Sequence, residues 1–348
     1  MKTSAIMNLV SKRSLRWMVS TLLFMASSTL VTSTSTSPAN ADERRDNADM
    51  TRLIRPISDS VQYSVAQVLS GGRPVALATI VSSDGYLLTK RSELSGDPIR
   101  IRLYDGRLYP ARVAAVRRRN DLALLRIDAP IKLTPLEMED YLPPVASFLI
   151  SPGRTGRPVG IGVLGVQPRK IEHKGRLGVL LVDNADGRAL VDEVHPNSGA
   201  DSAGVARGDL IVAINGHREV SKNSVMETLR GMFPGEDVRL TILRPGKTQG
   251  LETMEMDARI RDLNMMRESE NDSRVNGPRN DRLSGFDRVI QHDTVLDPDE
   301  CGGPILDTSG RVIGINIARA GRVVSYALPS SLVMTELASM LQETRRAE

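Results

Sequence analysis

The sequence predicts a mainly β protein, and three local patterns carry that prediction. Residues 99–104 alternate apolar and polar side chains, as a strand with one buried face does. Residues 75–82 form an apolar, β-branched run that ends at the turn signal Ser83-Asp84-Gly85. Asp105-Gly106 is a second hairpin signal, and it leads into another apolar stretch. Many short strands separated by such turns are typical of a β-barrel or a β-sandwich.

The middle and the end of the chain have a different character. From Gly175 to about Asp257, short strands alternate with glycine-containing turns, and residues 221–231 form one clear helical pattern. Residues 261–285 are expected to be a flexible linker, because most of the segment is polar, charged and poor in apolar side chains. Strand-like sequence resumes at Arg288, and residues 331–342 are expected to form a closing amphipathic helix.

The first 41 residues have the features of an export signal. A basic start precedes a 15-residue apolar run from Trp17 to Val31, and Ala39-Asn40-Ala41 matches a small-x-small cleavage site. The run is shorter than the roughly 20 residues that a spanning helix needs, so a cleaved signal is favoured over a retained anchor. We therefore expect an exported protein of the periplasm or cell envelope, without a transmembrane span after cleavage.

Composition excludes several classes of function. The chain carries a net charge of +4, and the first 41 residues account for all of it with four lysines and arginines and no acid. A remainder without net positive charge, with only 3% aromatic residues in the chain, does not predict nucleic-acid binding. Cys301 is the only cysteine, so no internal disulfide can form. No group of histidines and cysteines has the spacing of a metal site, and no cofactor is predicted.

Several motifs on either side of the middle segment resemble, in the same order, those of the HtrA/DegP family of trypsin-like serine proteases. The matching segments are residues 78–89, 120–127, 291–304, 310–316 and 325–329. The resemblance implies a two-barrel trypsin-like (chymotrypsin-fold) domain, formed by residues 52–170 and 286–348. Members of that family are often trimers, so the resemblance leaves a homo-oligomer open.

The segment between these parts resembles a bacterial PDZ domain. Its motifs are residues 175–179, 197–205, 208–211 and 214–216. The resemblance implies an inserted PDZ-like domain over residues 174–260 that binds peptides or unfolded chains. A glycine loop there can offer several N–H donors to a carboxylate, and a strand edge beside a helix can hold an extended peptide. The residues expected to bind the peptide are Leu177, Gly178, Val179, Val225 and Leu229.

The resemblance also assigns the positions of a catalytic triad. Asp121 matches the acid that orients the base, and Cys301 matches the nucleophile. Ser92 stands where the family has its catalytic histidine, and a hydroxyl cannot accept a proton near neutral pH. Asp299 and Cys301 match the oxyanion positions, where Asp299 replaces a glycine and adds a negative charge.

Two functions follow from these residues. The favoured one is a catalytically degenerate protease homologue that binds peptide C-termini or misfolded proteins. The alternative is an active endopeptidase that uses Cys301 with an unrecognised base, for which His292 is the nearest histidine in sequence. Three roles stay open for Cys301: a packing residue of an inherited turn, a reactive thiol, or a true nucleophile.

Overall fold

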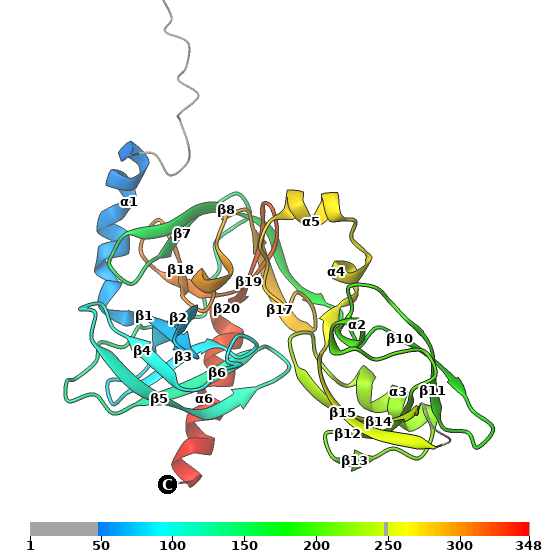
Figure 1. Cartoon of the computed structure of the whole chain (residues 1–348). Helices are drawn as coiled ribbons and strands as arrows, with labels where there is room; N and C mark the ends of the chain where they lie inside the picture. Colours follow the sequence, from blue (N-terminus) through cyan, green and yellow to red (C-terminus); the bar gives the residue numbers. More distant parts are fainter. Residues whose placement is uncertain (1–47, 247–249, 348) are drawn as a thin grey trace, which may run out of the picture. The chain divides into compact units, whose positions relative to one another are not determined.

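The structure is a computed structural model that describes residues 48–246 and 250–347, so the expected export signal lies outside the described residues. After helix α1 (Ala48–Ser60) and the short turn η1 (Gln62–Ser64), six strands close a first barrel (Figure 1). The strands are β1 (Val65–Ser70), β2 (Arg73–Ile80), β3 (Tyr86–Lys90), β4 (Ile99–Arg102), β5 (Leu108–Arg117) and β6 (Leu122–Ile127). All their pairings are antiparallel, in the order β1-β2-β3-β6-β5-β4. Its interior is filled by small and branched side chains, among them Val68, Ile80 and Leu125.

A second closed barrel takes its strands from two separate parts of the chain. It is formed by β7 (Phe148–Pro152), β8 (Pro158–Ile171), β17 (Phe286–His292), β18 (Pro304–Asp307), β19 (Val312–Gly321) and β20 (Val324–Pro329). Strand β17 pairs with β8, which precedes it by more than a hundred residues. The chain therefore leaves this barrel after β8 and re-enters it at β17. Helix α6 (Ser330–Ala347) follows directly and packs against β19 and β5.

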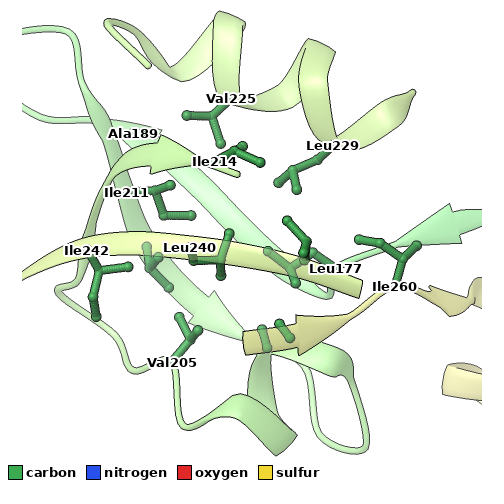
Figure 2. Close-up of a cluster of buried hydrophobic side chains, with 14 of the residues drawn as sticks. Leu177, Ala189, Val205, Ile211, Ile214, Val225, Leu229, Leu240, Ile242 and Ile260 are labelled. Atoms are coloured by element: carbon green, nitrogen blue, oxygen red, sulfur yellow. The ribbon is translucent and has the colours of Figure 1, made fainter. Parts of the chain in front are cut away.

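A third sheet lies in the sequence between the two halves of the second barrel. Its strands are β10 (Val179–Asp183), β11 (Ala189–Val194), β12 (Leu210–Ile214), β13 (His217–Arg218), β14 (Asp237–Pro245) and β15 (Leu251–Arg259). The short helices α2 (Gly199–Ala203) and α3 (Lys222–Arg230) accompany it. Figure 2 shows Val225 and Leu229 of α3 directed toward Ile214 and Leu240 of the sheet. Two barrels with an intervening β domain confirm the fold class predicted from the sequence.

The structure corrects the expectation of a flexible linker at 261–285. Strand β16 (Arg261–Asp262) pairs with β9 (Gly175–Arg176), and helices α4 (Leu263–Arg267) and α5 (Glu270–Asn276) follow. The polar residues of this segment satisfy one another, since Ser269 and Asp272 form a capping box. At its end, Arg282 is buried completely. Low apolar content did not predict the structure of this segment, because helix caps and buried polar contacts order it.

Candidate functional site

Ser92 and Asp121 lie together at the end of the first barrel. The Ser92 hydroxyl donates to Oδ2 of Asp121 at 2.8 Å, and the Ser92 backbone N–H donates to Oδ1 at 2.9 Å. Asp121 sits in the turn between β5 and β6 with φ of 58°, and its side chain is fully buried. The structure thus brings together the two residues that the resemblance assigns to the acid and to the missing histidine.

A buried lysine, which the sequence reasoning did not single out, completes this cluster. Nζ of Lys90 lies 3.0 Å from Glu93 and 3.6 Å from Asp121, and the lysine has no exposed surface. Burial by itself would lower the pKa of Lys90, but the carboxylates of Glu93 and Asp121 outweigh it and raise that pKa above its usual value. Lys90 is therefore a cation in the folded chain. A lysine at the end of the apolar strand β3 was the available signal.

Arg282 extends the cluster on the other side of Asp121. Its Nη1 lies 3.9 Å from Oδ1 of Asp121, and its Nη2 donates to the carbonyl of Gly285 at 2.7 Å. The guanidinium also stacks over the ring of Phe233, 4.1 Å from its centroid. Asp121 is thus surrounded by one hydroxyl and two cations, which is a stable setting for a buried carboxylate.

Cys301 is fully buried in the turn after η2 (Pro298–Glu300). Its backbone N–H donates to the carbonyl of Pro298 at 3.4 Å, and its carbonyl accepts from Leu77 N at 2.8 Å. Burial raises the pKa of the thiol to about 12, although the charge of Lys90 opposes that rise. A neutral thiol without exposed surface is a poor nucleophile. The N–H expected to stabilise an oxyanion is occupied within the turn.

The other expected oxyanion residue, Asp299, lies in an acidic part of the same turn. Burial raises the pKa of the Asp299 carboxyl, and the neighbouring Asp297 adds to that rise. Burial also raises the pKa of Glu300 to about 7. Both side chains line a polar cavity of about 520 Å³ together with Arg154 and Arg157. Acidic groups here do not provide the donors that an oxyanion requires.

The turn that follows α3 packs directly on Ser92. A Cβ atom at Gly235 would lie 3.1 Å from Cβ of Ser92, and Arg259 Nη2 donates to the carbonyl of Ser92 at 2.9 Å. Glu236, in the same turn, bridges to Arg91 at 3.0 Å and to Arg118 at 2.6 Å. Ser92 is 5% exposed as a result. An imidazole at this position would be larger than the serine side chain that the turn now covers.

The structure does not place His292 beside Cys301 as a base. His292 lies in β17, and its Nδ1 is paired with Thr294 Oγ1 at 2.7 Å. Burial lowers its pKa to about 4, because the charged imidazolium would lose its hydration. In the described part of the chain, no hydrogen bond joins His292 to Cys301. The rescue by His292 that the sequence left open therefore has no structural basis.

The expected peptide-binding residues border a groove of about 410 Å³ between β10 and α3. Leu177, Gly178, Val179 and Leu229 line it, as expected. The expectation for Val225 is wrong, because its side chain is buried in the core (Figure 2). Successive helical positions differ in direction by about 100°, so the next residue, Met226, lines the groove instead. Helix α4 contributes Leu263, Met266 and Arg267, which the sequence reasoning had assigned to a linker.

The loop Leu177–Gly178 leaves backbone donors free at the end of this groove. The carbonyl of Leu177 accepts from Ala200 N at 3.0 Å, and that of Gly178 accepts from His195 N at 2.9 Å. The N–H groups of Leu177 and Gly178 donate to no backbone or side-chain group within residues 48–246 and 250–347. Gly178 has φ of 92°, which glycine adopts without strain. Two N–H groups in such a loop can bind a carboxylate.

His173 fixes the helix side of the groove. Its Nδ1 accepts from Gly175 N at 3.0 Å, so its Nε2 carries the proton that is donated to the carbonyl of Arg230, also at 3.0 Å. The ring also stacks on Phe233, with 4.8 Å between centroids. Helix α3 is therefore tied to the start of the Leu177–Gly178 loop.

The chain is similar to known proteins in sequence. Residues 162–254 match the PDZ domain family. Two curated proteins, each named "Probable periplasmic serine endoprotease DegP-like", are 27% identical to the chain. The protein from Marinomonas sp. (strain MWYL1) aligns over 56% of the chain and 59% of its own length, and that from Hahella chejuensis over 48% and 54%. The chain thus spans less than two thirds of either relative.

Among solved structures, Rv3671c from M. tuberculosis H37Rv, described as the inactive form of a Ser343Ala mutant, covers 83% of the chain and is covered over 92% of its own length. Its TM-score is 0.43 and its sequence identity is 12%. The two closed barrels, the PDZ match and the curated relatives lead to one conclusion. The chain is a homologue of the HtrA/DegP-like serine proteases, with a trypsin-like two-barrel fold and a PDZ domain.

Proposed function

We propose that this homologue is a catalytically degenerate protease that binds peptide C-termini, or the termini of misfolded proteins, through its PDZ domain. The observation that carries the proposal is a contrast within the chain. The groove beside Gly178 is open and apolar, whereas Cys301 has no exposed surface. A chain that can receive a peptide but cannot present its nucleophile is suited to binding.

The groove has the three parts that capture of a terminus requires. Strand β10 is an edge of its sheet, pairing with β11 alone among the described strands, so an extended peptide can add beside it. The free N–H groups of Leu177 and Gly178 can hold the terminal carboxylate. The apolar wall from Met226 and Leu229 can take the last side chain.

The triad positions support the loss of proteolysis. A hydroxyl holds Asp121 where a base would be oriented, and no imidazole is present there. The N–H of Cys301 is turned to Pro298, and the thiol stays protonated at neutral pH. For proteolysis, the fold would have to rearrange so that a nucleophile, a base and an oxyanion donor come together.

The proposed place of action is the periplasm or cell envelope. The basic and apolar first 41 residues support export, and the curated relatives are named as periplasmic. None of the helices in residues 48–246 and 250–347 is long and apolar enough to cross a membrane.

A titration with one labelled peptide, ending in valine, tests the binding proposal. We expect saturable binding to the mature chain (residues 42–348), and loss of binding when the terminal carboxylate is amidated. Leu180→Gln should weaken binding, because Leu180 lines the groove. Val182→Gln is the matched control, since Val182 is an exposed residue of the same strand that does not line the groove. Equal affinity for the acid and the amide would contradict the proposal.

A further inference from the structure

Three arginines line the peptide groove without an acidic partner. Arg176 precedes the Gly178 loop, Arg230 ends α3, and Arg267 ends α4. All three are exposed, and none forms a salt bridge with any residue in the part of the chain that the structure describes. Among the residues that the structure describes, no aspartate or glutamate lines the groove. Other arginines of this domain do form salt bridges, as Arg239 does with Asp257 and Arg244 with Asp209.

Helix α4 holds one of these arginines at the groove. Strand β16 pairs in register with β9, Arg261 opposite Arg176 and Asp262 opposite Gly175. Buried Asp262 then caps α4 by accepting from Asn264 N at 3.0 Å. The helix is short but fixed, and its Met266 reaches the Gly178 loop, with Cε 2.8 Å from the place of a Cβ at Gly178. Arg267 follows Met266 directly.

The chemistry of the groove is therefore an apolar floor bordered by unpaired cations. The floor is formed by Leu177, Val179, Met226, Leu229 and Met266. A ligand with one terminal carboxylate supplies a single negative charge against three guanidinium groups. A cleft lined by charges of one sign attracts ligands of the opposite sign and raises their rate of association. Additional acidic side chains on the ligand would complete this complementarity.

We propose that the groove selects polypeptide C-termini in which an apolar last residue is accompanied by acidic side chains. This inference rests on the proposed function and adds the class of terminus that the domain takes. The two can fail separately, because binding of a terminus and preference for acidic termini are measured with different peptides.

The preference for acidic termini is tested with three labelled peptides of equal length. Fluorescence anisotropy measures the affinity of each peptide for the mature chain. All end in valine with a free carboxylate, and their other variable positions are acidic, neutral or basic. We expect the acidic peptide to bind about tenfold more tightly than the neutral one at low salt, and the basic peptide to bind most weakly. The ratio between acidic and neutral peptides should shrink as salt is added, because the arginines are exposed.

Variants separate the arginines from the rest of the domain. Arg230→Gln and Arg267→Gln should each lower the affinity for the acidic peptide about threefold more than the affinity for the neutral peptide. Arg218→Gln is the matched control, an exposed arginine of β13 that does not line the groove. Equal affinities for acidic and neutral peptides, or an effect of Arg218→Gln equal to that of Arg267→Gln, would overturn the inference and leave the proposed function intact. Failure of all three peptides to bind would overturn both.

Discussion

Ser92 occupies both carboxylate oxygens of Asp121, with its hydroxyl on Oδ2 at 2.8 Å and its backbone N–H on Oδ1 at 2.9 Å. An oxygen of a buried carboxylate that is left without a hydrogen-bond partner costs about 1–3 kcal/mol. Here a small hydroxyl satisfies it, and Lys90 balances its charge. The acid therefore persists as part of a structural cluster.

This arrangement predicts that introducing a histidine at position 92 and a serine at position 301 does not create a protease. In the double variant Ser92→His, Cys301→Ser, the larger imidazole has to fit a buried position beside the Gly235 turn, and the N–H of residue 301 is expected to remain bonded to Pro298. We expect the double variant to cleave unfolded, fluorescently labelled casein no faster than the single variant Cys301→Ala does. The release of fluorescent peptides measures this cleavage. Turnover that appears in the double variant but in neither single variant would show that the site can open.

The thiol of Cys301 is predicted to be unreactive in the folded chain. Cys301 has no exposed surface, and its pKa is raised to about 12 by burial. Because it is the only cysteine, labelling with a chromogenic disulfide at pH 8 reports this one site. We expect labelling at least about a hundredfold slower than in urea-unfolded chain, which serves as the control. Labelling of the native chain at the rate of the unfolded one would restore the reactive-thiol role.

Replacing Lys90 with methionine is predicted to destabilise the fold strongly. The change leaves the buried carboxylate of Asp121 and the partly buried carboxylate of Glu93 without their shared cation, and breaking a buried pair costs about 3–5 kcal/mol. Lys222→Met is the control, because Lys222 pairs with the exposed Asp183 and its loss should cost less than about 1 kcal/mol. Urea unfolding measures the stability of both variants. Equal midpoints for the two variants would contradict the buried-ion account.

His292 is predicted to make stability depend on pH below neutrality. Its pKa is about 4 in the folded chain and about 6.5 when unfolded, so between these values the unfolded chain binds the extra proton. The contribution of neutral His292 to the free energy of unfolding is complete above pH 6.5. As pH falls toward 4, the free energy of unfolding decreases by up to about 3 kcal/mol. Comparing wild type with His292→Gln by urea unfolding at several pH values measures it. His217→Gln, at an exposed position of β13, is the matched control substitution.

Glu300 is predicted to change stability with pH in the opposite direction. Burial raises its pKa to about 7, so its folded form keeps a proton that the unfolded chain has already released. Its favourable contribution is present below about pH 4.5 and is lost as pH rises toward 7. Glu300→Gln should therefore gain stability relative to wild type across this range. A difference that does not vary with pH would contradict the prediction.

The sequence predicted the fold well where local pattern and motif order agreed. Alternation at residues 99–104 and the helical spacing of Val225 and Leu229 correspond to β4 and α3. It failed where order depends on side-chain pairing across the chain. Helices α4 and α5 lie in a polar segment whose caps and buried Arg282 are visible only once folded. Helix α1 was not predicted from the sequence either.

Sequence reasoning about the site was similarly divided. The motif order located Ser92, Asp121 and Cys301, and the structure brings Ser92 and Asp121 into contact. The sequence could not reveal that Lys90 is buried beside Asp121 and Glu93, since a lysine at a strand end is ordinarily solvated. Nor could it separate Val225 from Met226, because both satisfy the helical pattern and only packing decides which one faces the groove.

The central claim is that this chain binds peptide termini without cleaving them. The most direct measurement is mass spectrometry of the acidic valine-ended peptide after it has saturated the mature chain and been released by acid. We expect all of the recovered peptide to be intact after prolonged incubation. Fragments of the peptide that form with wild type and are absent with Cys301→Ala would contradict it.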